Sequence, residues 1–341
     1  MNKGVYVIAE AGVNHQGSEA MAYKLIDVAI ESGADCVKFQ TFKAEKLVDA
    51  SAPLAAYQVR QMDGAVQNQY ELLKSLEFNE DVFTRLKNYC DKKGIAFLST
   101  AFDEESLDFL VSLGIAVIKI PSGELTNLPY LRKAASYGLP VILSTGMADI
   151  EEVQASIRAL LNAGLSKDKI TVLHCTTEYP APADQLNMLA MKTLSMETGC
   201  KVGYSDHSEG DAAAIIAVAL GATIIEKHFT LDKTLPGPDH QASMEPVELK
   251  NYISKIRATC LMLGSASKFA GENEAKNKIV ARKSIFFARD LGKGHILTEK
   301  DLIMKRPGNG VSPMELDSVL GKELIHEVQM GERFDWNTVI V

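Results

Sequence analysis

The chain has 341 residues, 46% of them hydrophobic, and a formal net charge of −8. This length is enough for one large hydrophobic core and a small second domain. The negative charge and the lack of a basic stripe argue against a nucleic-acid-binding surface, so we expect no nucleic-acid partner.

The sequence also indicates a compartment. No apolar run approaches the roughly 18 residues of a membrane-spanning helix, and the first residues, MNKGVYVIAEAG, lack the apolar core of a signal peptide. The cysteines are odd in number and have no C-x-x-C spacing: Cys36, Cys90, Cys175, Cys200 and Cys260. Cys36 and Cys175 lie in apolar strand patterns and are expected to be buried free thiols. We therefore expect a cytoplasmic protein with no membrane partner.

Eight short β-type runs alternate with helical segments along the first three quarters of the chain. The runs are VYVIAEAG, DCVKFQTF, IAFLSTAF, AVIKIPSG, PVILSTGM, ITVLHCTTEYP, KVGYSD and TIIEKHF. Segments such as EAMAYKLIDVAIESG between them carry apolar residues at helical spacing. The pattern predicts an α/β fold, a (β/α)8 TIM barrel over residues 1–264. A doubly wound open sheet is the alternative, but eight regular units favour closure. The longest interruption, Lys43 to Asn79, is expected to cross the mouth of the barrel.

The pattern changes after Gly264. Residues 265–282 are polar, lack strong periodicity and are interpreted as a linker. Residues 283–341 combine short β runs, glycine turns and isolated helical turns, which predicts a compact small domain. A domain of this size is only marginally stable alone and gains stability by docking onto another surface.

Two histidines end neighbouring predicted strands. His207 follows KVGYSD, and His228 lies in TIIEKHF. In a parallel strand–helix–strand unit they meet at the carboxyl ends of the strands, where α/β proteins build their sites. Two adjacent imidazoles, with an oxygen ligand or water completing the shell, suit a divalent transition metal. Two satisfied strand-end histidines are the alternative.

Other predicted strands also end in polar side chains. Side chains alternate between the interior and exterior of a barrel, and buried polar groups are costly unless they serve a site. Together they indicate a lined pocket. The residues are Glu10, Lys38, Gln40, Thr100, Lys119, Ser122, Glu124, Thr177, Tyr179, Ser205 and Glu226. Lys119 and Ser122 differ in parity, so Pro121 must redirect the chain if both face inward.

This set of side chains has a chemical meaning. Two interior lysines with several hydroxyls suit a small polyanion bearing carboxylate and phosphate. A metal held by two histidines would polarise a carbonyl oxygen. Acceptors and donors suited to a polyol are found at Glu10, Gln40, Tyr179 and Asp239. The combination suggests carbon–carbon bond formation by an aldolase or a condensing synthase, and the residues alone leave both open.

Long motifs run in order from about Val5 to the C-terminus. They are IAEAGVNHQGS, VKFQTF, FLSTAFDEESLDFL, KIPSGELTNLPYL, ILSTGMA, LHCTTEYPAP, GYSDHS, IIEKHFTLD, PGPDHQASMEP and KRPGNGVSP. In these motifs the chain resembles the bacterial sialic acid synthase family. The segment from about Lys283 is similar to that family's antifreeze-like (SAF) domain, which in relatives packs over the barrel of the partner subunit. The resemblance therefore implies a domain-swapped homodimer.

The resemblance also implies a reaction. Phosphoenolpyruvate, N-acetylmannosamine and water would give N-acetylneuraminate and phosphate through C–O cleavage, which makes the protein a transferase. The family's metal is Mn²⁺, replaceable by Mg²⁺ or Co²⁺, and its ligands match His207 and His228. It polarises the open-chain sugar aldehyde that C3 of phosphoenolpyruvate attacks.

Further roles follow from the matched motifs. Phosphoenolpyruvate contacts match Lys38, Thr100, Lys119, Ser122 and Ser205, with Thr177 in the place of a family asparagine. Sugar contacts match Glu10, Gln40, Tyr179 and Asp239. Arg306 in KRPGNG matches the arginine that reaches the other subunit's site and contacts the N-acetyl group. The Thr177 departure keeps a hydroxyl that can bond a phosphate oxygen.

The proton-transfer residue is a separate question. Glu124, next to Ser122, is our candidate for activating the water or relaying a proton. A carboxylate facing the dipole of a following helix is the alternative. Glu10 and Tyr179 are the other catalytic candidates.

The sugar is the open point of this interpretation. Relatives that make legionaminic acid use a 2,4-diacetamido-trideoxy sugar and share nearly all these motifs, and pseudaminic acid synthases share the barrel and the metal pair. Our first interpretation is N-acetylneuraminate synthase, and the alternative is N,N'-diacetyllegionaminate synthase. Discrimination is expected from Lys43 to Asn79 and around Asp239.

Two other classes of protein are also considered. A Schiff-base aldolase would use Lys119 or Lys38. A non-catalytic carbohydrate- or ice-binding protein would leave Lys38, His207 and His228 unexplained.

Overall fold

A computed structural model describes residues 4–54 and 68–340 of the chain. It contains two compact units, Met1–Gly264 and Ser265–Val341. Each unit is described by itself. In the described parts of the chain, none of the helices is both long and apolar enough to cross a membrane.

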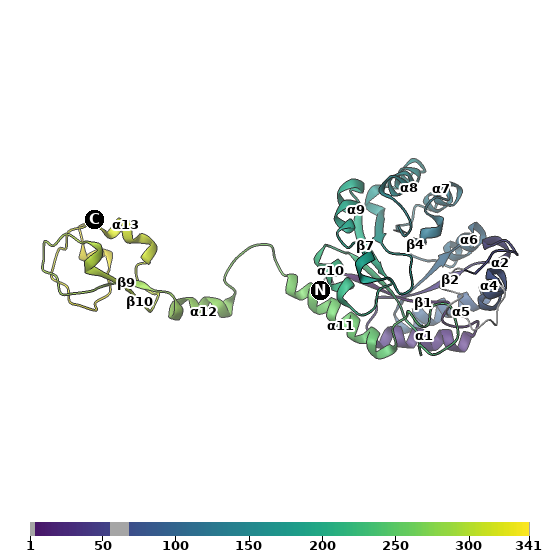
Figure 1. The fold of residues 1–341 in the computed structure, drawn as a ribbon, viewed down its shortest axis with the longest axis horizontal. Helices are drawn as coiled ribbons and strands as arrows, with labels where there is room; N and C mark the ends of the chain where they lie inside the picture. The colour runs from purple at the N-terminus through teal and green to yellow at the C-terminus, as the bar shows by residue number, and fades with distance from the viewer. Residues whose placement is uncertain (1–3, 55–67, 341) are drawn as a thin grey trace. The chain divides into compact units, whose positions relative to one another are not determined.

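Eight parallel strands of the first unit close into a barrel, in the order in which they occur in the chain (Figure 1). They are β1 Tyr6–Gly12, β2 Cys36–Thr41, β3 Ala96–Ala101, β4 Ile118–Ile120, β5 Val141–Ser144, β6 Ile170–His174, β7 Lys201–Asp206 and β8 Ile224–His228. The predicted barrel is confirmed and the open sheet is excluded, because β1 pairs with both β2 and β8.

A helix follows each strand and covers the outside of the barrel (Figure 1). These helices are α1 Glu19–Glu31, α5 Glu80–Lys93, α6 Glu104–Ser112, α7 Leu128–Ser136, α8 Ile150–Asn162, α9 Ala190–Thr198, α10 Ala212–Ala219 and α11 Pro246–Leu263. Local sequence defines several of their ends. Asp149 and Glu152 form a capping box at the start of α8, and Gly94 ends α5 with a φ of 79°.

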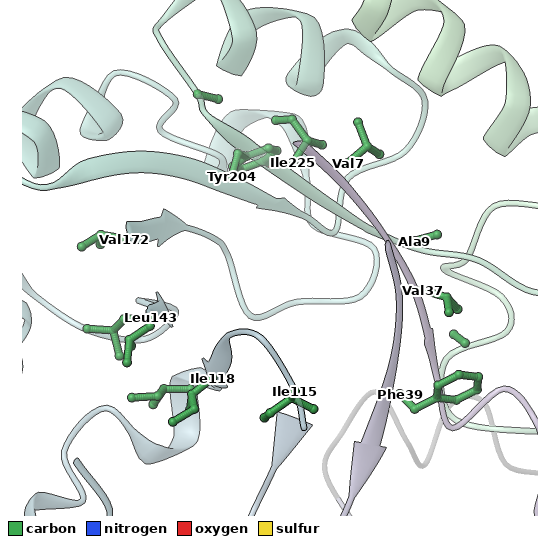
Figure 2. Packing of buried hydrophobic residues seen from close by; sticks show 14 of the residues in the cluster. Val7, Ala9, Val37, Phe39, Ile115, Ile118, Leu143, Val172, Tyr204 and Ile225 are labelled. Carbon is green, nitrogen blue, oxygen red and sulfur yellow. The ribbon is translucent and has the colours of Figure 1, made fainter. Parts of the chain in front are cut away.

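Apolar side chains fill two layers of the barrel. One layer lies between strands and helices and includes Val7, Ala9, Val37 and Val172 (Figure 2). The other lies inside the barrel and consists of Ile8, Cys36, Leu98, Ile142 and Leu173. The alternation of Val7, Ile8 and Ala9 between the two layers follows the two-residue period of a strand. Cys36 and Cys175 are buried free thiols, as predicted.

The segment from Lys43 to Asn79 departs from the regular strand–helix pattern. It contains α2 Ala44–Leu47 and α4 Gln69–Leu76, while residues 55–67 of it lie outside the described part of the chain. Leu72 and Leu76 of α4 form a small apolar cluster with Val13 and Phe42, which follow β1 and β2. This cluster holds α4 beside the carboxyl ends of the strands.

The second unit has its own apolar core, which includes Ile285, Phe287 and Phe334. Strands β9 Ser284–Phe287 and β10 Leu302–Lys305 pair antiparallel, and the helical turns are η4 Glu299–Asp301, η5 Pro313–Glu315, α13 Leu316–Val319 and η6 Trp336–Thr338. The segment interpreted as a linker, 265–282, contains a helix that we did not predict, α12 Glu272–Ala281. None of its residues is buried, and because the helix buries no apolar stripe, the hydrophobic pattern could not indicate it.

Candidate active site

A cavity of about 450 Å³ opens at the carboxyl ends of the barrel strands. It brings together the site residues that the sequence predicted within the barrel. They are Glu10, Lys38, Gln40, Thr100, Lys119, Ser122, Glu124, Thr177, Tyr179, Ser205, His207, His228 and Asp239. Strand register explains why they meet, because Glu10 is the partner of both Lys38 and His228, and Thr100 that of Lys119.

Lys119 and Ser122 both reach the cavity in spite of their opposite parity. Strand β4 ends at Ile120, and a 3-10 turn, η1 Ser122–Glu124, follows Pro121. The turn redirects the backbone, so Lys119 points inward from the strand and Ser122 from the turn. The expectation that Pro121 resets the path is confirmed.

Two lysines and two carboxylates form a buried charge cluster on the cavity floor. Lys38 Nζ lies 2.8 Å from Glu10 Oε2 and 3.6 Å from Glu226 Oε2. Lys119 Nζ lies 3.8 Å from Glu226 Oε1. All four side chains are at most 6% exposed. Both lysines line the cavity, and the two carboxylates balance their charges.

Hydroxyl groups extend this cluster. Lys38 Nζ donates to Thr100 Oγ1 at 3.0 Å, and Lys119 Nζ donates to Ser144 Oγ at 2.6 Å. Ser205 Oγ donates to Glu226 Oε1 at 3.0 Å. Such an array of ammonium and hydroxyl donors suits phosphate and carboxylate oxygens.

The pKa values of the two floor carboxylates are shifted in opposite directions. Burial raises the pKa of Glu10 to about 7, against the opposing effect of Lys38. Burial also favours the neutral form of Glu226, but Lys119 and Lys38 outweigh it and lower the pKa of this carboxyl. The two lysines thus favour the ionised form of Glu226, whereas burial favours the protonated form of Glu10.

A glycine allows the hydroxyls of Ser122 and Thr177 to approach each other. The backbone N–H of Gly146 donates to Ser122 Oγ at 2.9 Å. A Cβ at Gly146 would lie 2.2 Å from Thr177 Oγ1 and 2.9 Å from Ser122 Oγ. Only glycine leaves room for both hydroxyls here.

The two histidines lie together, as their strands predicted. The ring centroids of His207 and His228 are 5.8 Å apart. The ring of Tyr179 lies over His207, with centroids 4.2 Å apart. His207 Nδ1 is hydrogen-bonded to the carbonyl oxygen of Thr176 at 2.6 Å, so Nδ1 carries the proton and Nε2 has the lone pair.

These histidines fit a divalent metal ion. His228 Nδ1 is buried and has no hydrogen-bond partner. Burial lowers the pKa of His207 to about 4, and burial together with His207 lowers that of His228 well below its usual value. Both rings are thus neutral, as metal ligands must be. The described residues contain no group of three or more His, Cys, Asp or Glu side chains that could hold a metal.

Glu124 ends the η1 turn and lies before Asn127, the N-cap residue of α7, so it is not in the first turn of that helix. It lines the cavity, and its Oε2 accepts from Asn127 Nδ2 at 2.6 Å, just before α7. Burial raises the pKa of this carboxyl, and a raised pKa suits a group that exchanges protons near neutral pH.

Asp239 reaches the cavity on the loop after β8. Burial raises its pKa to about 6, and its backbone oxygen accepts from Ser243 Oγ at 2.6 Å. Asn14 anchors the same loop, donating to Ser243 Oγ at 2.9 Å and to the carbonyl of Phe229 at 2.8 Å.

Some features of the site were not assigned by sequence reasoning. Glu226 was placed at a strand end without a role, yet it contacts both lysines. Ser144 was missed, although its position two residues after the inward Ile142 could have indicated it. The apolar wall of the cavity was also missed. It is formed by Phe42, Leu47, Leu72, Leu73, Leu76 and Phe102.

Arg306 is the predicted site residue that lies outside the barrel unit. It belongs to the second unit, is exposed, and donates from Nε to the carbonyl of Ala281 at 3.0 Å. Its matched role in a partner's site stays a prediction.

The chain is similar to known proteins over most of its length. The NeuB family model matches residues 25–268, and the SAF domain model matches residues 282–340. The chain is 46% identical to an N,N'-diacetyllegionaminic acid synthase from Legionella pneumophila, over 98% of this chain and 94% of that protein. It is 47% identical to one from Campylobacter jejuni, over 94% and 96% of the two chains.

A solved structure with a similar fold has a related name. It is an N-acetylneuraminic acid (sialic acid) synthetase from Leptospira borgpetersenii in complex with citrate, 34% identical, with a TM-score of 0.70 over 80% of this chain and 90% of that one. These matches span most of the chain and therefore identify its family. The chain belongs to the NeuB family of synthases and carries a SAF domain at its C-terminus.

Proposed function

We propose that the protein condenses phosphoenolpyruvate with 2,4-diacetamido-2,4,6-trideoxymannose and water, giving N,N'-diacetyllegionaminate and phosphate. N-acetylneuraminate synthase, our first interpretation of the sequence, becomes the second candidate. The relatives at 46% and 47% identity are named for the legionaminic product, whereas the sialic acid synthetase is 34% identical.

The observation that carries this choice is the polarity of the cavity. Its floor holds Lys38, Lys119 and the histidines, and its wall is apolar, with Leu72 and Leu73 from α4. The reacting aldehyde must lie at the floor, beside phosphoenolpyruvate. The far end of the sugar then reaches the wall.

The two sugars differ at that far end. The diacetamido sugar presents a C6 methyl and a second acetamido methyl, which bury well against leucine and phenylalanine. N-acetylmannosamine would bring hydroxyls at C4 and C6 to the same surface, where an unpaired hydroxyl loses its hydrogen bonds to water.

Residues of the chain have distinct parts in this proposal. Phosphoenolpyruvate is bound by Lys38 and Lys119 with the hydroxyls of Thr100, Ser122, Thr177 and Ser205. His207 and His228 would hold a divalent metal, Mn²⁺ in our proposal with Mg²⁺ or Co²⁺ as substitutes, which supplies Lewis-acid polarisation of an aldehyde oxygen. Glu10, Gln40, Tyr179 and Asp239 orient the sugar through its polar groups.

We assign the proton transfer to Glu124. Its half-buried carboxyl, with the raised pKa, takes a proton from the water that adds at C2 of phosphoenolpyruvate. Glu10 and Tyr179 remain the other candidates for this step.

The test is phosphate release from phosphoenolpyruvate with Mn²⁺, with either sugar as acceptor. We expect a higher kcat/KM with the diacetamido sugar. Faster release with N-acetylmannosamine would make N-acetylneuraminate the product, and release with neither sugar would reject the synthase. Borohydride trapping with pyruvate tests the Schiff-base aldolase, for which we expect no adduct on Lys119 or Lys38.

A variant pair tests the wall itself. Leu73→Gln adds a polar group to the wall and should lower kcat/KM for the diacetamido sugar about tenfold, with the KM for phosphoenolpyruvate unchanged. Leu128→Gln on α7 is the control, because that leucine is 41% exposed and is not among the cavity residues. Equal effects of the two variants would reject the wall as a specificity element.

The homodimer and the role of Arg306 are part of the proposal. Arg306→Ala should raise the KM for the sugar far more than that for phosphoenolpyruvate. Mixing Arg306→Ala chains with His228→Ala chains should restore activity if subunits share a site, and no recovery would reject sharing.

A further inference from the structure

A buried ion pair joins β7 and β8 directly behind the two histidines. Asp206 precedes His207, Lys227 precedes His228, and Asp206 and Lys227 are register partners. Because side chains alternate along a strand, the histidines face the cavity and the ion pair faces the helices. Lys227 Nζ lies 3.4 Å from Asp206 Oδ2, and each residue is 1% exposed.

The surroundings of this pair are apolar. Val202 and Tyr204 of β7 and Ile225 of β8 face the same side of the sheet, and Figure 2 shows Tyr204 and Ile225 in the apolar layer. Within the described residues of the eight strands, Asp206 and Lys227 are the buried charged side chains on the side facing the helices. A charged pair in this layer is therefore an exception that calls for a reason.

Stability is a poor explanation for such a pair. Removing two charges from water costs free energy that can exceed the gain from their attraction. Apolar side chains of similar volume are often as stable or more stable in such positions. An ion pair with hydrogen bonds instead fixes the relative positions of the groups that it joins, because it requires particular atoms to lie at particular distances.

The contacts of the pair fix the backbone of Ser208, the residue after His207. Asp206 Oδ1 accepts from the backbone N–H of Ser208 at 2.9 Å and from its hydroxyl at 2.6 Å. Lys227 Nζ donates to the carbonyl oxygen of Ser208. The pair thus binds both the backbone N–H and the backbone carbonyl of the residue after His207.

Helix α11 holds the pair from outside. The hydroxyl of Tyr252 donates to Asp206 Oδ2 at 2.8 Å, and its ring centroid lies 5.8 Å from Lys227 Nζ. Each Asp206 oxygen therefore has a partner, and the position of the pair is defined from three elements, β7, β8 and α11.

We propose that Asp206 and Lys227 are positioning residues that set the spacing of His207 and His228 for one shared divalent metal ion. They act from the outer face of the strands, through the backbone of Ser208 and the β7–β8 register. The inference rests on the metal site of the proposed function, but it concerns side chains that do not reach the cavity.

The test is a Mn²⁺ titration of the whole protein, with free Mn²⁺ followed by electron paramagnetic resonance. The variants are Asp206→Asn, Lys227→Met and the double variant Asp206→Asn/Lys227→Met. Each single variant leaves a buried charge without its partner and should lose stability. The double variant removes both charges, so we expect its melting temperature to return towards that of the wild type.

Metal affinity should not return with stability. We expect the Kd for Mn²⁺ of the double variant to be about tenfold higher than that of the wild type, the range seen when groups that orient metal ligands are removed. The visible absorption of bound Co²⁺ should change as well, because it reports ligand geometry. A double variant that binds Mn²⁺ as tightly as the wild type overturns the proposal.

Arg257→Met is the matched control. Arg257 is paired with Asp35 at 2.5 Å, just before the amino end of β2. This variant should lower stability and leave the Kd for Mn²⁺ unchanged, and an equal loss of affinity would show that the effect is general destabilisation. A wild-type protein that binds no Mn²⁺ would instead reject the metal site itself, and that result is distinct from equal affinity of wild type and double variant.

Discussion

The two ends of the barrel interior differ in chemistry although the same strands build both. At the amino ends the interior is filled by Ile8, Cys36, Leu98 and Ile142. Two residues further along the same four strands stand Glu10, Lys38, Thr100 and Ser144, which bond to one another or to Lys119.

This contrast separates two demands on one architecture. The apolar layer stabilises the closed barrel by removing its side chains from water. The polar layer has to offset the cost of burial with ion pairs and hydrogen bonds, so its presence is explained by what it binds. Substitutions in the polar layer should therefore lower activity, whereas substitutions in the apolar layer should lower stability and leave activity unchanged.

The largest effect is expected from the histidines of the polar layer. His228→Ala or His207→Ala should lower kcat by at least about 10³-fold, since Lewis-acid stabilisation is worth several kcal/mol. Phosphoenolpyruvate should still bind, because the lysines remain. Phosphate release and a phosphoenolpyruvate titration measure the two properties, and metal-dependent activity in both variants would refute the two-histidine site.

Next is a substitution in the apolar layer. Leu173→Ala should lower the free energy of unfolding by about 3 kcal/mol through lost burial and a cavity. Below its unfolding transition the variant should keep the wild-type kcat. Urea denaturation measures the loss, with Ile216→Ala on α10, 45% exposed, as a control expected near zero. If Leu173→Ala lost activity while folded, the two layers would not be separable.

The second unit also contains a buried carboxylate, Asp301, and hydrogen bonds reach both of its oxygens. Asp301 accepts hydrogen bonds from Arg289, His295 and Thr298. Burial alone would raise the pKa of this carboxyl, but these bonds hold it below its usual range. The unfolded chain takes up the proton near pH 4 and the folded unit does not. The stabilisation is therefore present above that pH and lost as pH falls towards the folded pKa.

Asp301→Asn tests this account. At pH 7 it should cost the second unit about 2 kcal/mol, because charged hydrogen bonds are lost, and it should flatten the acid branch of the stability curve. The single tryptophan, Trp336, packs in this unit and reports its unfolding by fluorescence. An unchanged acid branch in the variant would assign the pH dependence to other groups.

The smallest expected effect concerns a backbone position at the edge of the polar layer. In Gly146→Ala the new methyl meets Thr177 Oγ1, so the KM for phosphoenolpyruvate should rise about tenfold, equivalent to about 1.4 kcal/mol. Gly292→Ala in the second unit is the control, because a Cβ there has no atom within 4 Å and the residue does not line the cavity. Steady-state kinetics give the KM of both variants for phosphoenolpyruvate. Similar KM values would mean that the hydroxyls of Ser122 and Thr177 can move aside without weakening phosphoenolpyruvate binding.

Most of the barrel and many cavity residues could be predicted from the sequence. The eight strands were visible because β-branched runs recur between amphipathic helices, and the period of two placed Lys38, Thr100 and His228 on the inner face. The predicted β6 run, in contrast, extended to Pro180, whereas the strand ends at His174. The hydrophobic pattern shows where an apolar run lies, but it does not show at which residue a strand stops pairing with the next strand.

Partnerships across strands could not be predicted in the same way. A pattern within one strand reports which face a residue occupies, but not which side chain stands opposite. Glu226 bridges Lys38 and Lys119 only because closure brings β8, β2 and β4 around one interior. The apolar wall likewise needed α4 to pack beside Phe42.

By itself, then, the sequence determined the local periods, the strand-end histidines and the motifs that place the chain in its family. Tertiary structure alone decided that the cavity lysines are paired with carboxylates, that an apolar wall faces them, and that Asp206 and Lys227 meet behind the histidines. The physical reason is that local patterns follow from the geometry of one strand or helix. Ion pairs and cavities depend on distances between segments that only the closed barrel brings together.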